Sequence, residues 1–257
     1  MDGRPVKPFW GAPTSHLNFC EEDYVVTRYV AEFINTLSSL VYGQPSSPDF
    51  DSRYPSLFCR KEAPTDRGRG EAAVLFGIYG LARGHGHGHG RNNGPRLVSY
   101  CGLVGVGVCS AGYHMTLKYH TQMSDELSMH LLTTPLLYRI LTFNKSARFT
   151  RAAGVSLSAL LAVLMAVHML MDEFLLHATA FGFAVYMIAT RVTRLIPLQV
   201  PDPQVRRKIE RIARLGTVSF GFGFFVWLID EWACGMLSGA RHSVGLPVAF
   251  LLELHGW

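Results

Sequence analysis

The sequence predicts an all-α polytopic membrane protein, a bundle of seven transmembrane helices whose last helix is incomplete. Three observations predict this fold. Hydrophobic residues make up 49% of the 257 residues and charged residues only 17%, which is too apolar for an ordinary soluble domain. The apolar residues gather in runs of about 17 to 25 residues, the length needed to cross a bilayer. Arg and Lys concentrate in alternate connections between these runs, as in membrane proteins of fixed orientation.

The first apolar segment is interrupted. Val30–Gly43 matches the first half of a helix and Ala72–Ala82 the second half. Residues 44–71 between them hold several prolines and charges of both signs, and such a backbone would leave polar groups unsatisfied in hydrocarbon. We interpret residues 44–71 as a disordered insertion in the first span. The alternative is a long functional loop, which is uncommon in compact domains.

The later segments follow without interruption. Those long enough to cross a bilayer are Leu97–Leu117, Leu127–Phe143, Ala152–Met171, Phe174–Val192 and Leu215–Leu237. The seventh segment, Val244–Trp257, would reach about 21 Å as a helix, whereas the hydrocarbon is about 30 Å thick. The last span is therefore expected to be incomplete.

Charge predicts the orientation. The connection after the third segment holds Lys145, Arg148 and Arg151, and the connection after the fifth is more basic still. The connection between them is acidic, at Asp172 and Glu173. Because basic connections stay cytoplasmic, the N-terminus is expected to be lumenal. The distribution of basic residues by connection, without interleaved aromatic residues, argues against nucleic-acid binding.

Three polar residues lie in or beside these apolar segments. Ser110 and His114 are four residues apart, so they share one face of a helix, and Asp125 begins the next segment. Polar groups at such depth are costly and usually functional, so the group suggests an intramembrane metal hydrolase. Asp125 could transfer a proton and Ser110 could donate a hydrogen bond to an oxyanion, beside a zinc-activated water. The alternative for each residue alone is a helix–helix contact.

An acidic cluster precedes the first span. Asn18, Glu21 and Asp23 offer hard oxygen ligands of the kind that Ca²⁺ prefers, and Glu32 follows inside an apolar run. An unpaired carboxylate at Glu32 would be costly, so it needs a partner or a metal. The alternative is that the acidic residues meet a helix dipole.

Other polar residues are open to two interpretations each. Residues 84–90 read GHGHGHG, which favours a flexible low-complexity loop over a metal-binding tract. Three more histidines on or beside spans are interpreted as polar contacts rather than ligands: His130, His168 and His177. The predicted topology puts Cys20 and Cys234 on the oxidising side, where either a disulfide or two buried thiols would fit.

Two stretches together, NFCEEDYVVTRYVAEFIN and SAGYHMTLKYHTQMSDEL, resemble the alkaline ceramidase family. WGAPTSHLNFCEEDY, WLIDEWAC and LELHGW extend the resemblance over most of the chain outside residues 44–71 and the Arg-Gly-His loop. The resemblance implies a seven-span amidase that cleaves the N-acyl bond of ceramide or phytoceramide to a sphingoid base and a fatty acid. It also implies a ceramide-type lipid substrate, contact with membrane lipids, and a location in the endoplasmic reticulum or Golgi.

The resemblance also assigns residues. It divides the chain into an N-terminal calcium-binding arm, residues 1–29, and a transmembrane hydrolase domain, residues 30–257. The implied calcium ligands are Asn18, Phe19 through its carbonyl, Glu21, Asp23 and Glu32. The implied zinc ligands are His114 and His255, with Ser110 and Asp125 beside the metal-bound water. Cys20 and Cys234 match the family's disulfide pair.

The C-terminal residues set the last expectation. His255 matches the first histidine of a His-x-x-x-His pair, whose second histidine would lie beyond Trp257. A chain that ends there is expected to bind zinc poorly. The alternatives to an active hydrolase are therefore a catalytically impaired, truncated family member and a receptor-like seven-span zinc protein.

Overall fold

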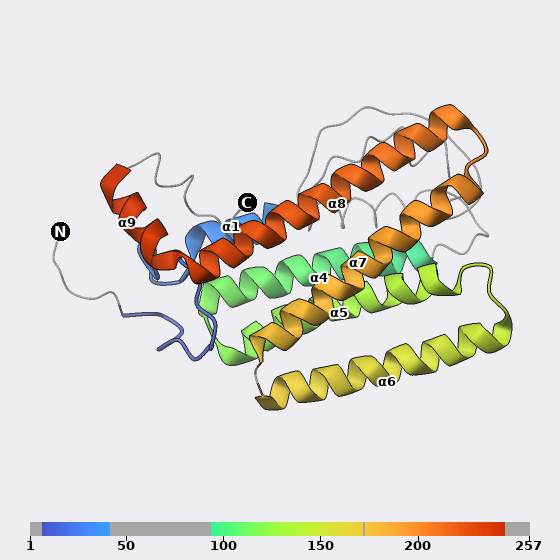
Figure 1. The fold of residues 1–257 in the computed structure, drawn as a ribbon. Helices are drawn as coiled ribbons and strands as arrows, with labels where there is room; N and C mark the ends of the chain where they lie inside the picture. Colours follow the sequence, from blue (N-terminus) through green and yellow to red (C-terminus); the bar gives the residue numbers. More distant parts are fainter. Residues whose placement is uncertain (1–6, 42–93, 172, 245–257) are drawn as a thin grey trace. The chain divides into compact units, whose positions relative to one another are not determined.

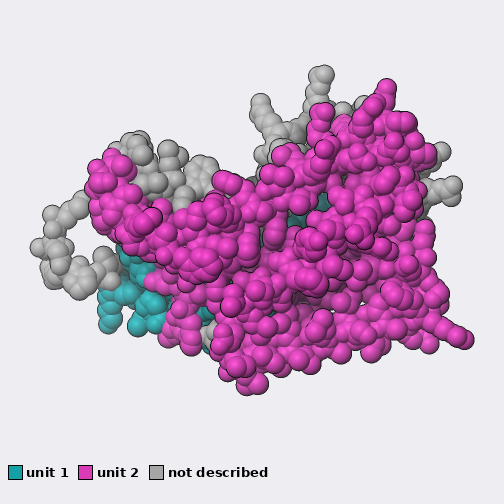
Figure 2. All heavy atoms as spheres, in the orientation of Figure 1, with its two compact units in different colours: residues 1–13, 23–128 teal, residues 14–22, 129–257 magenta. Residues whose placement is uncertain are grey.

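The computed structural model describes residues 7–41, 94–171 and 173–244. Within these ranges the chain is built of helices, with an isolated β-bridge between Thr27 and Val30 (Figure 1). The chain forms two compact units, coloured teal and magenta in Figure 2. Unit 1 comprises residues 1–13 and 23–128, and unit 2 comprises residues 14–22 and 129–257. The predicted insertion at 44–71, the half-span Ala72–Ala82 and the loop of residues 84–90 lie outside the described residues.

Unit 1 is organised around α1 (Phe33–Val41) and α4 (Gly94–Thr116), which pack against each other. α1 begins later than the predicted Val30, because the preceding residues bond to the end of α4 instead. The backbone amides of Ala31 and Glu32 donate to the carbonyls of Met115 and His114, at 3.0 and 2.9 Å. These bonds hold the entry to α1 on the last turn of α4.

A tight turn joins α4 to α5 (Tyr119–Thr142). Leu117 is fully buried and adopts a left-handed backbone (φ 49°), and its amide donates to the carbonyl of Tyr113 at 2.8 Å. This conformation ends α4 and lets α5 start two residues later. The turn keeps the first turns of α5, with Asp125, in the same unit as the end of α4.

Unit 2 contains the rest of α5 together with α6 (Ala147–Met171), α7 (Phe174–Gln199), α8 (Pro203–Trp232) and α9 (Cys234–Val244). α7 packs against both α6 and α8, and α9 packs against α8. Among the described helices, α6, α7 and α8 are long and apolar enough to cross a membrane. The predicted total of seven spans stays a prediction, because the last segment, from Val244 on, lies almost entirely outside the described residues.

The three long helices carry apolar side chains outside and polar side chains inside. Leu170, Phe183 and Phe222 are 85%, 65% and 60% exposed, whereas His177 and Asp230 are 2% and 1% exposed. A protein surface in water rarely shows such continuous apolar cover, but a surface in contact with lipid does. The distribution supports a membrane protein.

The sixth predicted span, Leu215–Leu237, has wrong bounds. α8 begins earlier because Asp202 caps it, accepting from the amides of Gln204 (2.8 Å) and Val205 (3.4 Å), with Pro203 in the first helical position. The basic residues that follow therefore lie on the helix and not in a loop. At the other end α8 stops at Trp232, so Cys234 begins a new helix instead of ending the span.

Candidate functional site

Glu32 and His114 form the centre of the polar group in unit 1. A carboxylate oxygen of Glu32 contacts Nδ1 of His114, and both side chains are buried, at 0% and 1% exposed. The sequence predicted that Glu32 needs a partner, and the structure supplies the histidine of the predicted zinc site. A buried carboxylate and a buried imidazole stabilise each other where neither could stand alone.

Two residues of α1 extend this group along the helix. Asn35 donates from Nδ2 to the same oxygen of Glu32 at 3.0 Å, and Ser39 donates to the carbonyl of Asn35 at 2.8 Å. Positions 32, 35 and 39 recur at helical spacing, so they form one polar face within an apolar helix. Sequence reasoning missed Asn35 and Ser39, although their spacing from Glu32 was the signal that could have found them.

The α1 polar face meets the predicted catalytic residues on α4. The hydroxyls of Ser39 and Ser110 are 3.0 Å apart, and the Ser110 side chain lies beside the Asp125 carboxylate. Asp125 is largely buried. The structure therefore brings Ser110, His114 and Asp125 into one unit, as their spacing predicted, and adds Glu32 beside them.

This arrangement fits metal chemistry. In metal sites, a histidine ligand commonly gives one ring nitrogen to a carboxylate, which fixes its tautomer and turns the other nitrogen toward the ion. The contact of Glu32 with Nδ1 of His114 has this form. The second predicted zinc ligand, His255, lies outside the described residues.

The predicted calcium ligands are divided between the two units. Asn18, Phe19 and Glu21 belong to unit 2, whereas Asp23 and Glu32 belong to unit 1. Asn18 is exposed, Phe19 is buried, and Glu21 and Asp23 are intermediate. Beside Asp23, burial and then the charge of that carboxylate raise the pKa of Tyr24 above its usual range. Calcium binding by this set stays a prediction.

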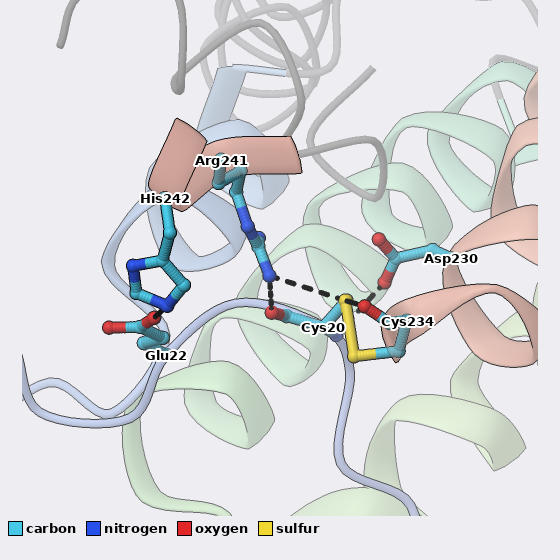
Figure 3. Close-up of a disulfide and its surroundings, with 6 residues drawn as sticks. All are labelled: Cys20, Glu22, Asp230, Cys234, Arg241 and His242. Carbon is cyan, nitrogen blue, oxygen red and sulfur yellow. Dashed lines mark hydrogen bonds and ion pairs between the residues drawn. A yellow bond between two sulfur atoms is a disulfide. The ribbon is translucent and has the colours of Figure 1, made fainter. Parts of the chain in front are cut away.

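The arm residues of unit 2 are fastened to α8 and α9 around Cys20 (Figure 3). The structure pairs the sulfurs of Cys20 and Cys234, whose Cα atoms are 5.1 Å apart. The Cys20 amide donates to the buried carboxylate of Asp230 at 3.1 Å, and the buried guanidinium of Arg241 donates to the Cys20 carbonyl. We call these four residues the arm clamp.

The chain is similar to known proteins over most of its length. The model of the Ceramidase family matches residues 11–45 and 72–257, so the match pauses across the predicted insertion. Alkaline ceramidase YPC1 of Saccharomyces cerevisiae is 27% identical over 265 residues, which cover 98% of this chain and 73% of the yeast protein. Alkaline ceramidase 3 of Mus musculus is 25% identical over 252 residues, covering 98% and 79%. These relatives do not favour the receptor-like or impaired alternatives. The chain belongs to the ceramidase family.

Proposed function

We propose that this protein hydrolyses the N-acyl amide bond of ceramide or phytoceramide in a zinc-dependent reaction, releasing a sphingoid base and a fatty acid. The observation that carries the proposal is the buried contact between Glu32 and His114, beside Ser110 and Asp125, in a chain of the ceramidase family. Both relatives described above carry the name alkaline ceramidase, and such enzymes are hydrolases of the ceramide amide.

The residues fit a zinc ion. His114 would be one ligand, with its ring oriented by Glu32, and His255 would be a second. When bound, zinc supplies a Lewis acid and lowers the pKa of its water to about 7. Glu32 has no need to touch the ion for this role, since its contact with Nδ1 already fixes the imidazole.

The chain's own side chains would then move the proton. Hydrolysis adds water across the C–N bond: the acyl carbon takes the oxygen, and the leaving nitrogen takes a proton. Asp125 would accept that proton from the water and return it to the sphingoid amine. Ser110, held between Ser39 and Asp125, would donate to the carbonyl oxygen as its charge develops.

A calcium ion would serve the arm. Asn18, the Phe19 carbonyl, Glu21, Asp23 and Glu32 are oxygen donors, and four of the five lie within six consecutive residues. Glu32 would then serve two sites at once, because its carboxylate also contacts His114. Loss of calcium would in that case reach the hydrolytic site through one side chain.

The proposed setting is the endoplasmic reticulum or Golgi membrane with a lumenal N-terminus. Lys145, Arg148 and Arg151 lie around the turn between α5 and α6, and a run of basic residues occupies the start of α8. These two places belong to the connections after the third and the fifth predicted spans, which lie on the same side of the membrane. Their positive charge favours the cytoplasmic side. Glycosylation tags at the N-terminus and next to Pro201 should report opposite sides. Tags reporting the same side would overturn this orientation.

The test of the function is hydrolysis by the full chain in detergent or lipid nanodiscs. Wild type, stripped of metal and resupplied with zinc, is expected to release fatty acid from ceramide or phytoceramide, while His114→Gln stays at background. His120→Gln is the matched control, because His120 is exposed near the start of α5. Equal turnover in wild type and His114→Gln, or turnover without zinc, would contradict the proposal.

A further inference from the structure

Three buried histidines meet inside unit 2. His130 comes from α5, His168 from the last turn of α6 and His177 from the first turns of α7. All three are buried, among helices whose outer surfaces are apolar. They are separate in sequence from the residues assigned above to hydrolysis.

Their ring nitrogens converge. Nε2 of His130 is 3.2 Å from Nδ1 of His177, and a ring nitrogen of His168 lies within 4.8 Å of one of His177. The ring centroids are 5.0 Å apart for His130 and His177, and 5.5 Å apart for His168 and His177. His177 is therefore the middle member of the group.

Phenylalanine side chains pack against the rings of His130 and His177. Phe181, one turn after His177, stacks on that ring at 6.2 Å and meets His130 edge-on at 6.2 Å. Phe220 of α8 packs in turn on Phe181 at 5.7 Å. Polar side chains buried between membrane helices are costly and commonly mark a site. An apolar wall around them excludes water and strengthens whatever they bind.

We propose that His130, His168 and His177 form a second metal site, which binds a divalent transition ion such as zinc and ties α5, α6 and α7 together. Imidazole is the ligand that zinc shares with copper and nickel, and three imidazoles favour these ions over Ca²⁺ or Mg²⁺. Two nitrogens bound tetrahedrally at about 2.0 to 2.1 Å from zinc are about 3.3 to 3.4 Å apart. The 3.2 Å between His130 and His177 is close to this spacing.

The third ligand is His168. One of its ring nitrogens lies within 4.8 Å of a ring nitrogen of His177, within reach of a shared ion. His168 lies in the last turn of α6 and His177 in the first turns of α7. The site goes beyond the proposed hydrolysis, because none of its ligands takes part in that reaction.

The experiment uses a full-length parent chain in which the other metal-binding candidates are removed. His114→Gln removes the proposed hydrolytic site, and glutamine at positions 85, 87 and 89 removes the histidine-rich tract. After metal stripping and zinc resupply, the parent is expected to retain about one zinc per chain. His130→Gln and His177→Gln, each added to the parent, are expected to lose it. His120→Gln on the exposed side of α5 is the matched control and should keep it.

The proposal would be overturned if the His130→Gln and His177→Gln variants retained as much zinc as the parent. It would also be overturned if the parent bound no zinc. A second measurement decides even if the variants fail to fold. Zinc should raise the unfolding midpoint of the parent by several degrees where the same concentration of Mg²⁺ does not. No difference between the two ions would also refute the site. Since the parent lacks His114, these results are independent of whether the protein hydrolyses ceramide.

Discussion

The two units bury polar groups of different character. In unit 1, a histidine meets a carboxylate, and a serine meets an aspartate, so donors and acceptors of protons are side by side. In unit 2, buried polar groups contact a group of the same kind or the backbone. His130 contacts His177, and Cys20 pairs with Cys234. Asp230 and Arg241 hydrogen-bond with the backbone of Cys20. The first set can do acid–base chemistry, whereas the second connects segments of the chain. Substitutions in unit 1 should therefore change turnover, and substitutions in unit 2 should change stability.

The largest expected effect is on turnover, from Asp125→Asn. Loss of the proton acceptor should lower kcat by about 10²- to 10⁴-fold, while the unfolding midpoint stays near that of wild type. Initial rates of fatty-acid release, with a thermal melt of the same sample, check both. Glu210→Gln is the control, because this half-exposed glutamate pairs only loosely with Arg206, at 4.0 Å. If Asp125→Asn lost much stability but kept its rate per folded molecule, the expectation that unit 1 substitutions change turnover would be wrong.

The second effect belongs to the arm clamp. Replacing both Cys20 and Cys234 with Ser should lower the free energy of unfolding by about 2 to 5 kcal/mol. Turnover per folded molecule should fall much less. Cys101→Ser is the control, since that cysteine is free and exposed. Mass mapping of the non-reduced protein should find the two peptides linked, and two free thiols would contradict the pairing.

A third substitution separates the two roles of Glu32. Glu32→Gln should weaken zinc binding by about 10- to 100-fold, since a carboxylate that orients a metal-bound histidine typically contributes this much. Excess zinc should then restore most of the turnover. If zinc binding is unchanged and only excess calcium restores turnover, Glu32 acts as a calcium ligand and not through His114. Glu22→Gln, an exposed glutamate of the arm paired with His242, is the control.

The smallest effect is expected at Ser39, which contacts Ser110 but not the substrate in the proposed reaction. Ser39→Ala removes two hydrogen bonds, one with the Asn35 carbonyl and one with Ser110. Only the bond with Ser110 reaches the proposed site, and its typical net contribution is about 1 kcal/mol, so turnover should fall by less than about tenfold. Ser110→Ala should cost more than Ser39→Ala. Equal losses in both variants would indicate that Ser110 only packs between the helices.

Much of the fold and part of the candidate site could be predicted from the sequence. Length and hydropathy predicted the helices, and the four-residue spacing of Ser110 and His114 predicted their shared face. The bounds of α8 were missed because basic residues were assigned to a loop, although Asp202 and Pro203 form a strong helix start. Asn35 and Ser39 follow Glu32 at helical spacing, a signal that the prediction did not use. Arg241 was missed because its contact with Cys20, which is far away in the sequence, leaves no spacing signal. His130, His168 and His177 were predicted to make polar contacts, and His130 does contact His177, at 3.2 Å.

The cap at Asp202 makes α8 a single stiff rod, 30 residues from Pro203 to Trp232. At 1.5 Å per residue it is about 45 Å long, whereas the hydrocarbon is about 30 Å thick. In a bilayer the arginines of α8 would lie at the headgroups of one leaflet, while the Asp230 carboxylate near the other end accepts from the Cys20 amide. The arm would thus be held at a fixed distance along α8 from the leaflet that binds the arginines. Bilayer thickness then sets how far the arm stands from the surface, so the same chain would hold it at different heights in thin and thick membranes.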